Sequence, residues 1–300
     1  MAQLKSKLQK SILSCLAFGL ISHLFFISLW GLSGVLFLSA GASAIEAEAS
    51  AIENVANCHI PLLKKGIVRH VSKQGLLQLE NGEEVRLTGL VLLRLYENAT
   101  SPLARKLNDL ARQTVALLRQ KLVGQTVTLR QKGRKRDRYD RLLAHVFAPD
   151  GQWMQKLLLQ KGLARSFSYA DNHVCMAQML AIEGQARKAR LGLWAFRLFT
   201  PQSAEQVEQL LHRRYRFTLV EGRVKKTALT RKWAFINFGD NWHNDFSIAI
   251  KKKYFHKMQR KGFDLQKLQG QKIRVRGWIE RWNGPLIKVT HKEQIELLSP

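Results

Sequence analysis

The chain has 300 residues, 46% of them hydrophobic, which is typical of a folded globular protein and excludes a largely disordered one. It carries 49 Lys and Arg against 22 Asp and Glu, a net charge of +27 at pH 7, which favours polyanionic partners such as nucleic acid, anionic lipid or acidic envelope polymer. Residues 45–200 and 201–300 each carry a net charge of +12, so a single basic tail is excluded as the source. The length predicts about two domains.

Residues 1–44 have the pattern of an export segment. A lysine-rich start precedes an almost wholly apolar run from Ile12 to Ala40, and Ala42-Ser43-Ala44 matches a signal-peptidase site. The run exceeds the ~20 residues that span a bilayer, so a cleaved signal peptide and an uncleaved signal anchor are both open, with a buried helix as a third interpretation. Export places the rest of the chain in the periplasm or on the envelope face of the inner membrane.

The cysteines are consistent with export. Residues 45–65 are expected to form a linker, and Cys15 belongs to the export segment, which leaves Cys58 and Cys175 as an even pair. Such a pair in an oxidising compartment predicts either a Cys58–Cys175 disulfide or two separate buried thiols. A metal site is not expected at either Cys, because none of the nine His residues has ligand spacing around them.

The pattern over residues 66–196 predicts a small barrel covered by helices. Residues 66–91 alternate as three strands, and Asn81-Gly82 is a strong hairpin signal. Helices are expected at 102–121, 151–161 and 173–190, and strands at 127–129 and 142–147. A basic loop precedes the last strand and contains Asp137-Arg138-Tyr139-Asp140-Arg141; it either holds guanidinium groups at the barrel mouth or is simply solvated.

A linker helix at 197–214 is expected to lead into a second small barrel at 215–300. Its strands are predicted at 217–224, 233–238, 245–250, 272–280, 286–290 and 293–297, with a helix at 251–269. This order suggests a barrel of the oligonucleotide/oligosaccharide-binding (OB) type. The predicted fold class is therefore α+β, mainly β, with two small OB-like barrels preceded by an N-terminal hydrophobic helix.

The second barrel is rich in both aromatic and basic residues, a combination that suits single-stranded nucleic acid. Trp242 and Trp282, in turn-like surroundings, are the candidate stacking residues, and Arg274 and Arg276 are the candidate phosphate contacts. The alternating aromatics of residues 233–235 are expected to belong to the barrel core.

Four further segments carry a family resemblance. Asn81–Gly89, Asp137–Ala144, Lys161–Ala164 and Ala189–Trp194 occur in the order and spacing of the staphylococcal nuclease (thermonuclease) family, so that residues 66–196 resemble one whole domain of it. Gly222-Arg223-Val224 and Ile273–Trp278 resemble OB-like domains that follow the nuclease domain in some exported bacterial proteins.

The resemblance implies specific roles for the basic residues. In that family calcium and two arginines grip a phosphodiester while a carboxylate activates water. Arg86 and Arg141 match the two arginines, whose planar forks donate paired hydrogen bonds to phosphate and stabilise transition-state charge. Arg138 and Tyr139 match loop positions that touch nucleotide phosphates.

The acids of the family are missing. Its Asp-Gly-Asp-Thr turn is here Ser72-Lys73-Gln74-Gly75, the calcium-ligand position holds Val91, and the general-base position holds Arg94. Calcium requires six to eight oxygen ligands, and arginine cannot act as a base at neutral pH. No metal or small-molecule cofactor is therefore expected, and calcium is expected only if the site is active.

The favoured function is binding of nucleic acid, or another polyanion, at the cell envelope without hydrolysis, as in a pseudoenzyme. One alternative is an active phosphodiesterase or endonuclease that hydrolyses DNA or RNA through a rearranged site. The other is an envelope scaffold for acidic polymer or lipid headgroups. The membrane is a further partner if residues 1–44 stay attached.

Overall fold

The computed structural model describes residues 58–97, 99–241 and 243–298. The expected export segment and Trp242 lie outside the described residues. Within the described residues, no helix combines the length and the apolar composition that crossing a membrane requires.

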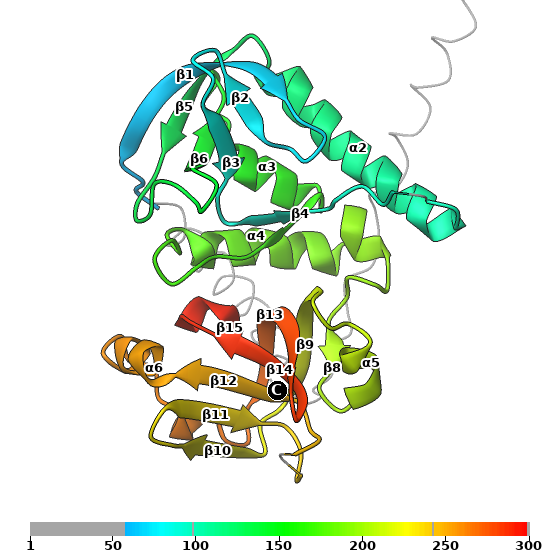
Figure 1. Cartoon of the computed structure of the whole chain (residues 1–300), viewed down its shortest axis with the longest axis vertical. Coiled ribbons are helices and arrows are strands. Elements are labelled where there is room, and N and C mark those ends of the chain that lie inside the picture. The colour runs from blue at the N-terminus through cyan, green and yellow to red at the C-terminus, as the bar shows by residue number, and fades with distance from the viewer. Residues whose placement is uncertain (1–57, 98, 242, 299–300) are drawn as a thin grey trace, which may run out of the picture. The chain divides into compact units, whose positions relative to one another are not determined.

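The first part of the described chain is a closed five-stranded barrel in the order β1-β2-β3-β6-β5, which confirms the predicted nuclease-type barrel (Figure 1). A separate two-stranded sheet pairs β4 with β7, and three helices accompany the strands. The elements are β1 (Leu62–Val71), β2 (Leu77–Leu79), β3 (Glu84–Leu87), β4 (Leu90–Leu92), α2 (Pro102–Leu122), β5 (Thr126–Arg130), β6 (Leu142–Phe147), α3 (Met154–Gln160), β7 (Ala164–Ser166) and α4 (Met176–Lys188).

Local signals in the sequence explain the elements of this barrel. Gly82 has φ +82° in the turn between β2 and β3, a conformation that favours glycine and makes the tight hairpin possible. Helix α2 begins after Ser101, whose hydroxyl accepts a hydrogen bond from the backbone N–H of Ala104 at 3.1 Å, with Pro102 at its first position. Its buried positions repeat at helical spacing from Leu107 to Leu122, and so one stripe packs on the barrel.

The second part is one eight-stranded sheet in the order β10-β11-β12-β14-β13-β9-β8, with β15 also paired to β13. Its pairing does not close among the described residues, so it is a partly open form of the expected barrel. The elements are η1 (Gly192–Ala195), β8 (Gln202–Ser203), α5 (Val207–Leu211), β9 (Phe217–Arg223), β10 (Lys226–Leu229), β11 (Trp233–Asn237), β12 (Ser247–Lys251), α6 (Lys252–Gln259), η2 (Gln266–Leu268), β13 (Lys272–Trp282), β14 (Gly284–Val289), η3 (Lys292–Gln294) and β15 (Ile295–Leu297).

Three segments differ from the sequence-based expectation. Strand β1 begins at Leu62, inside the expected linker, because it already pairs with Arg130 of β5 there. The expected linker helix at 197–214 instead supplies strand β8, parallel to β9, and the short helix α5, whose Leu210 is fully buried. The expected helix at 251–269 is regular only over α6 and is followed by a turn and the 3-10 segment η2.

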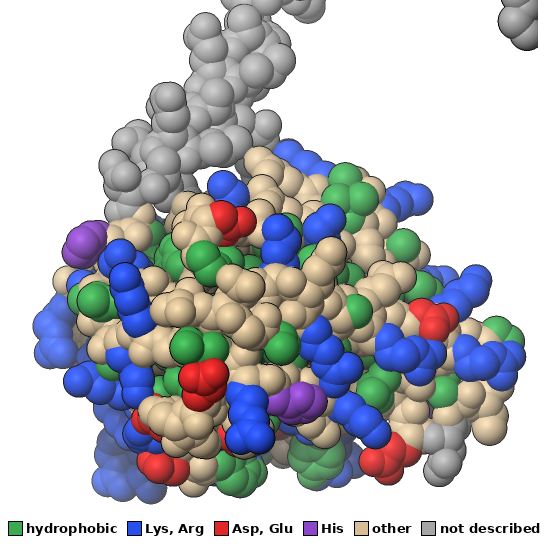
Figure 2. All heavy atoms as spheres, turned by 90° about the horizontal axis from the view of Figure 1, so that it is seen from above, with side chains coloured by type: hydrophobic (Ala, Val, Ile, Leu, Met, Phe, Trp, Pro, Cys, Tyr) green, Lys and Arg blue, Asp and Glu red, His purple; other side chains and the backbone are tan. Residues whose placement is uncertain are grey.

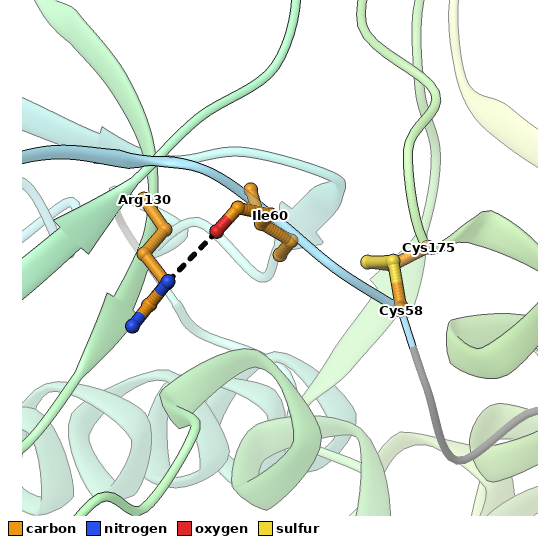
Figure 3. The surroundings of a disulfide bond; sticks show 4 residues. All are labelled: Cys58, Ile60, Arg130 and Cys175. Atoms are coloured by element: carbon orange, nitrogen blue, oxygen red, sulfur yellow. Dashed lines mark hydrogen bonds between the residues drawn. A yellow bond between two sulfur atoms is a disulfide. The ribbon is translucent and has the colours of Figure 1, made fainter.

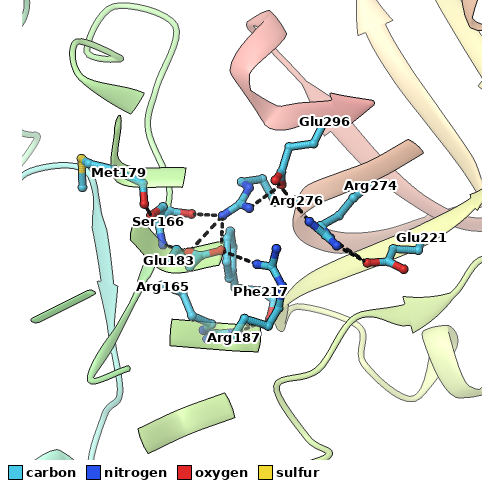
Figure 4. Close-up of polar contacts among 10 residues, drawn as sticks. All are labelled: Arg165, Ser166, Met179, Glu183, Arg187, Phe217, Glu221, Arg274, Arg276 and Glu296. Atoms are coloured by element: carbon cyan, nitrogen blue, oxygen red, sulfur yellow. Dashed lines mark hydrogen bonds and ion pairs between the residues drawn. The ribbon is translucent and has the colours of Figure 1, made fainter. Parts of the chain in front are cut away.

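A buried ion pair joins the two parts of the structure (Figure 4). Arg276 on β13 is 1% exposed and donates to both carboxylate oxygens of Glu183 on α4, at 2.9 and 3.1 Å. The same guanidinium donates to the carbonyl of Ser166 at 2.9 Å and to Glu296 Oε1 at 2.5 Å. Glu183 also accepts from the backbone N–H of Ser166. Buried charges are tolerated only when they are paired and hydrogen-bonded in this way.

Apolar packing accompanies this ion pair. One core cluster combines Leu107 of α2 and Ala186 of α4 with residues of the second part, namely Leu193, Trp194, Phe199, Phe217 and Leu219. Arg165 on β7 also donates to the backbone carbonyl of Phe217 at 2.8 Å. The barrel and the open sheet therefore share a continuous interface of apolar and polar contacts.

A disulfide joins Cys58 to Cys175 (Figure 3), with their Cα atoms 5.4 Å apart and 117 positions apart in the sequence. Cys58 stands just before β1, and Cys175 precedes α4. Arg130 on β5 donates to the carbonyl of Ile60 at 2.9 Å, which holds the segment between the disulfide and the barrel.

We predict that removing this disulfide lowers the free energy of unfolding by about 2–4 kcal/mol, because a cross-link over a long loop restricts the unfolded chain. Chemical denaturation of the oxidised protein, and of a Cys58→Ala/Cys175→Ala variant, measures the difference. Equal denaturation midpoints for the two proteins would contradict the prediction.

We predict that Arg276→Met lowers the free energy of unfolding by about 3–5 kcal/mol, because it removes a buried cation that donates hydrogen bonds to the Glu183 carboxylate and leaves Glu183 with Arg187 as its charged partner. The control is Arg274→Met on the same strand, whose carboxylate partners Glu221 and Glu296 are partly exposed. Denaturant titration should show a clearly smaller loss for Arg274→Met, and equal losses would rule out the buried pair as the reason.

Candidate nucleic-acid interface

Strands β3 and β6 place the two candidate phosphate-binding arginines near each other. On β3, Val85 and Leu87 face the barrel core at 0% and 3% exposure, so the alternation of a strand turns Arg86 away from the core. Strand β6 runs parallel to β3 in the next position of the barrel, with Leu142 opposite Val85. Arg141 is the residue directly before β6, so both guanidinium groups emerge at the same end of this strand pair.

Asp137 organises these two arginines. Its Oδ2 accepts from Arg141 Nε at 2.9 Å and Nη2 at 2.6 Å, and it lies 3.9 Å from Arg86 Nη1. Its Oδ1 accepts from the backbone N–H groups of Tyr139 and Arg141 at 2.9 and 3.2 Å. Burial alone raises the pKa of Asp137, but the hydrogen bonds from Arg141 and from these two N–H groups outweigh it and lower the pKa overall. The carboxylate therefore stays charged and holds the pair in place.

An exposed aromatic ring stands beside the arginine pair. Tyr139 is 61% exposed, and the guanidinium carbons of Arg138 and Arg141 each lie 4.7 Å from its ring centroid. Arg138 Nη2 also donates to the Tyr139 hydroxyl at 2.6 Å. The turn is completed by Asp140, which has φ +61°, a left-handed conformation uncommon outside glycine. The loop thus presents two cations and a ring to solvent as one group, which is suited to a phosphate with its attached nucleoside.

A second acid, Glu83, contacts Arg136 of the same basic loop. Glu83 forms an ion pair with Lys64 and accepts from Asn81 Nδ2 at 2.7 Å and from Arg136 Nη2 at 2.6 Å. The hydrogen bond from Lys64, followed by that from Asn81, lowers the pKa of Glu83 to about 2. Arg136 in turn donates to the backbone carbonyl of Asp140 at 2.6 Å. Asp137 and Glu83 are therefore both already partners of cationic side chains.

The residues at the family's metal and base positions do not fit calcium. Val91 packs against the apolar cluster that contains Leu107 and Trp194, and Arg94 is exposed. Ser72 caps its own turn by accepting from the backbone N–H of Gln74 and Leu76. Within residues 58–97, 99–241 and 243–298, no group of three His, Cys, Asp or Glu side chains is close enough to hold a metal ion. The hard oxygen ligands that calcium needs are not gathered here.

The structure treats the predicted nucleic-acid-binding residues of the second part differently. The prediction that Arg276 contacts nucleic acid is wrong, because its guanidinium is buried in ion pairs with Glu183 and Glu296. Arg274 is also unsuited, since its side chain is 13% exposed and is held between Glu221 and Glu296. Trp282 is 46% exposed and remains a candidate, and Trp242 lies outside the described residues.

Two features of the site were missed by reasoning from the sequence. Asp137 belongs to the loop motif, yet nothing in its spacing indicates that it lies beside Arg86, which is on a distant strand. The aromatics Trp233 and Phe235 were expected in the core, but Ala234 and Ile236 fill the core instead at 0% exposure. All four side chains are apolar, so the alternation along β11 did not distinguish its two faces.

Comparison with known proteins gives one family and several relatives. The family model described as "Staphylococcal nuclease homologue" matches residues 84–196. The SPbeta prophage-derived endonuclease YokF and the endonuclease YncB of Bacillus subtilis (strain 168) are each 40% identical over 65 residues, which is 21% of this chain and 22% and 30% of theirs. An uncharacterized endonuclease of Escherichia coli O157:H7 is 28% identical over 90 residues, 30% of this chain and 56% of its own. The chain thus covers less than two thirds of each of these relatives.

We predict that acid destabilises the barrel partly through Glu83. Because its pKa in the folded protein is about 2, below the ordinary 4.5, its contribution to stability is complete above pH 4.5 and is lost as the pH falls from there toward 2. Denaturation midpoints measured across this range should fall less steeply for Glu83→Gln than for the unmodified protein. Glu84→Gln, which changes an exposed neighbour, should keep the original slope, and identical slopes for all three proteins would disprove the prediction.

Proposed function

Residues 84–196 form a domain of the staphylococcal nuclease family, and on that premise we propose that the protein binds the phosphate backbone of nucleic acid without calcium-dependent hydrolysis. The observation that carries the proposal is the convergence of Arg86 and Arg141 on Asp137, with Arg138 and Tyr139 exposed beside them. Two fixed guanidinium groups can donate paired hydrogen bonds to one phosphate with little loss of side-chain freedom.

The overall charge supports a polyanionic ligand. The excess of Lys and Arg is spread over both parts of the chain, and Figure 2 shows basic side chains distributed across the face of the molecule that it presents, with fewer acidic ones among them. Such a surface attracts nucleic acid from a distance, whatever the nucleotide sequence. The fixed arginine pair then supplies the local contact.

The chemistry of the site supports binding over hydrolysis. Hydrolysis of a phosphodiester by this family's route needs a metal ion and a carboxylate base, and those positions hold Val91 and Arg94. The nearby acids Asp137 and Glu83 have lowered pKa values because they are hydrogen-bonded to cationic side chains or backbone N–H groups. An acid engaged in this way is a weak base, and it is not free to coordinate metal.

Three of the relatives are named endonucleases, and this favours a second candidate function. In that case the chain hydrolyses DNA or RNA, and Asp137 or Glu83 leaves its arginine partners when substrate enters. This alternative requires calcium-dependent cleavage, which the first proposal does not allow.

We also propose that the protein acts outside the cytoplasm. The export pattern of residues 1–44 and the Cys58–Cys175 disulfide both support this location, since disulfides persist in oxidising compartments. Both observations are consistent with the periplasm and with the envelope face of the inner membrane.

The test measures binding and cleavage of a labelled DNA by the full-length protein in mild detergent, with calcium and with chelator. We expect salt-sensitive binding without cleavage. Arg86→Lys and Arg141→Lys should each weaken binding roughly tenfold, because they keep the charge but lose the bidentate fork. The control Lys106→Ala removes an exposed charge of α2 and should change affinity little.

Calcium-dependent cleavage that is abolished by Arg141→Lys would establish the endonuclease instead. Binding to acidic wall polymer or anionic vesicles, with none to DNA, would point to an envelope scaffold. Equal losses for Lys106→Ala and the two arginine variants would show that only net charge matters.

A further inference from the structure

Three aromatic side chains lie together on the outer face of the open sheet. On β11, Ala234 and Ile236 point into the core, so Trp233 and Phe235 point to the opposite side and are half-buried. Trp282, at the end of β13, lies with its ring centroid 5.3 Å from that of Trp233 and 5.8 Å from that of Phe235. We call Trp233, Phe235 and Trp282 the aromatic face.

The core of the sheet does not need these rings. The strand pairing places Ile236 opposite Ile248, and Ile248 opposite Ile287, and all three are 0% exposed. On the outer side, Phe235 stands between Ala228 of β10 and Ala249 of β12. These small neighbours leave the rings standing above the sheet. A cluster of large apolar side chains kept at the surface in this way is typical of a binding site.

Basic side chains surround the aromatic face. Lys251 is paired opposite Trp233 in the sheet, and its Nζ lies 5.6 Å from the Trp233 ring centroid. Lys226 on β10 is exposed and lies on the same face of the sheet as Ala228, the neighbour of Phe235. The acid on this side of β13 is Glu280, which forms an ion pair with Lys288. The surroundings of the rings therefore favour a negatively charged ligand.

We propose that the aromatic face stacks the bases of single-stranded nucleic acid while the surrounding lysines, Lys226 and Lys251, contact its phosphates. Every base offers a flat ring surface for stacking on an aromatic side chain, and the backbone offers the charge that matches the cations. In a duplex the base surfaces are covered by their neighbours, so the face selects unpaired strands.

This inference rests on the proposed function for the class of ligand and adds a second site to it. The arginine pair of Arg86 and Arg141 contacts phosphate, which single and double strands share. The aromatic face contacts bases, which only the single strand exposes. The two sites thus predict different effects of mutation on the two forms of DNA.

The experiment measures fluorescence anisotropy of a labelled oligo(dT) and of a duplex of the same length with the full-length protein in mild detergent. We expect Trp282→Ala and Trp233→Ala each to weaken oligo(dT) binding roughly tenfold, which is the loss expected when one base no longer stacks. Duplex binding should stay within about twofold. Tyr96→Ala, which removes a 40% exposed ring outside both sites, should leave both affinities unchanged.

Conservative variants guard against misfolding. Trp282→Phe and Trp233→Phe keep a stacking ring, so each should retain most of the oligo(dT) affinity that the alanine variants lose. Loss in the phenylalanine variants equal to that in the alanine variants would overturn the stacking role.

The outcomes separate the two proposals. Unchanged oligo(dT) binding in the alanine variants, with both DNA forms weakened by Arg86→Lys, overturns the aromatic site and leaves the proposed function intact. No binding of either DNA form by the unmodified protein overturns the proposed function. Loss of self-association on sedimentation, with oligo(dT) affinity unchanged, would show that the face joins two copies of the chain and would overturn the inference.

Discussion

The buried ion pair between Glu183 and Arg276 is the constraint on which the described structure depends. One partner comes from helix α4 of the closed barrel and the other from the central strand β13 of the open sheet, and their side chains are 0% and 1% exposed. Separating the two parts would break this buried ion pair and leave Glu183 with Arg187, and Arg276 with Glu296, as charged partners. Breaking a buried ion pair in this way is costly. The nuclease-type barrel is therefore one half of a larger folding unit, and its arginine site and the aromatic face belong to the same folded body.

The acids near the phosphate-binding arginines have a structural use in this protein. Asp137 is hydrogen-bonded to Arg141 and lies 3.9 Å from Arg86, and Glu83 forms ion pairs with Lys64 and Arg136. Each carboxylate thus orders cations that point to solvent, where a mobile side chain would lose more conformational entropy on binding. An anionic ligand meets guanidinium groups already in place, but it must compete with Asp137 for them. The same arrangement that prepares the site for phosphate also limits how tightly phosphate is held.

Turn and helix-start residues made many strands and helices predictable from the sequence. Contacts between residues far apart in the chain could not be predicted in this way. Asn81-Gly82 and Ser101-Pro102 marked a hairpin and a helix start that the structure contains. Arg276 alternates with Val275 and so looked solvent-exposed, but that side of β13 packs on α4, whose Glu183 is 93 positions away in the sequence. Strand β11 has apolar residues on both faces, so only the partner strands decide which face is the core. The missing acids of the family are evident from the sequence, whereas the ion pairs that engage Asp137 and Glu83 are visible only in three dimensions.

The Cys58–Cys175 disulfide also determines how the protein responds to a protease. The cross-link encloses a stretch of chain that contains both Arg86 and Arg141, with its two cysteines 117 positions apart. A single backbone cut within this stretch leaves the fragments covalently joined and still held by the barrel's strand pairing. A nicked molecule would therefore keep Arg86 and Arg141 on one connected scaffold.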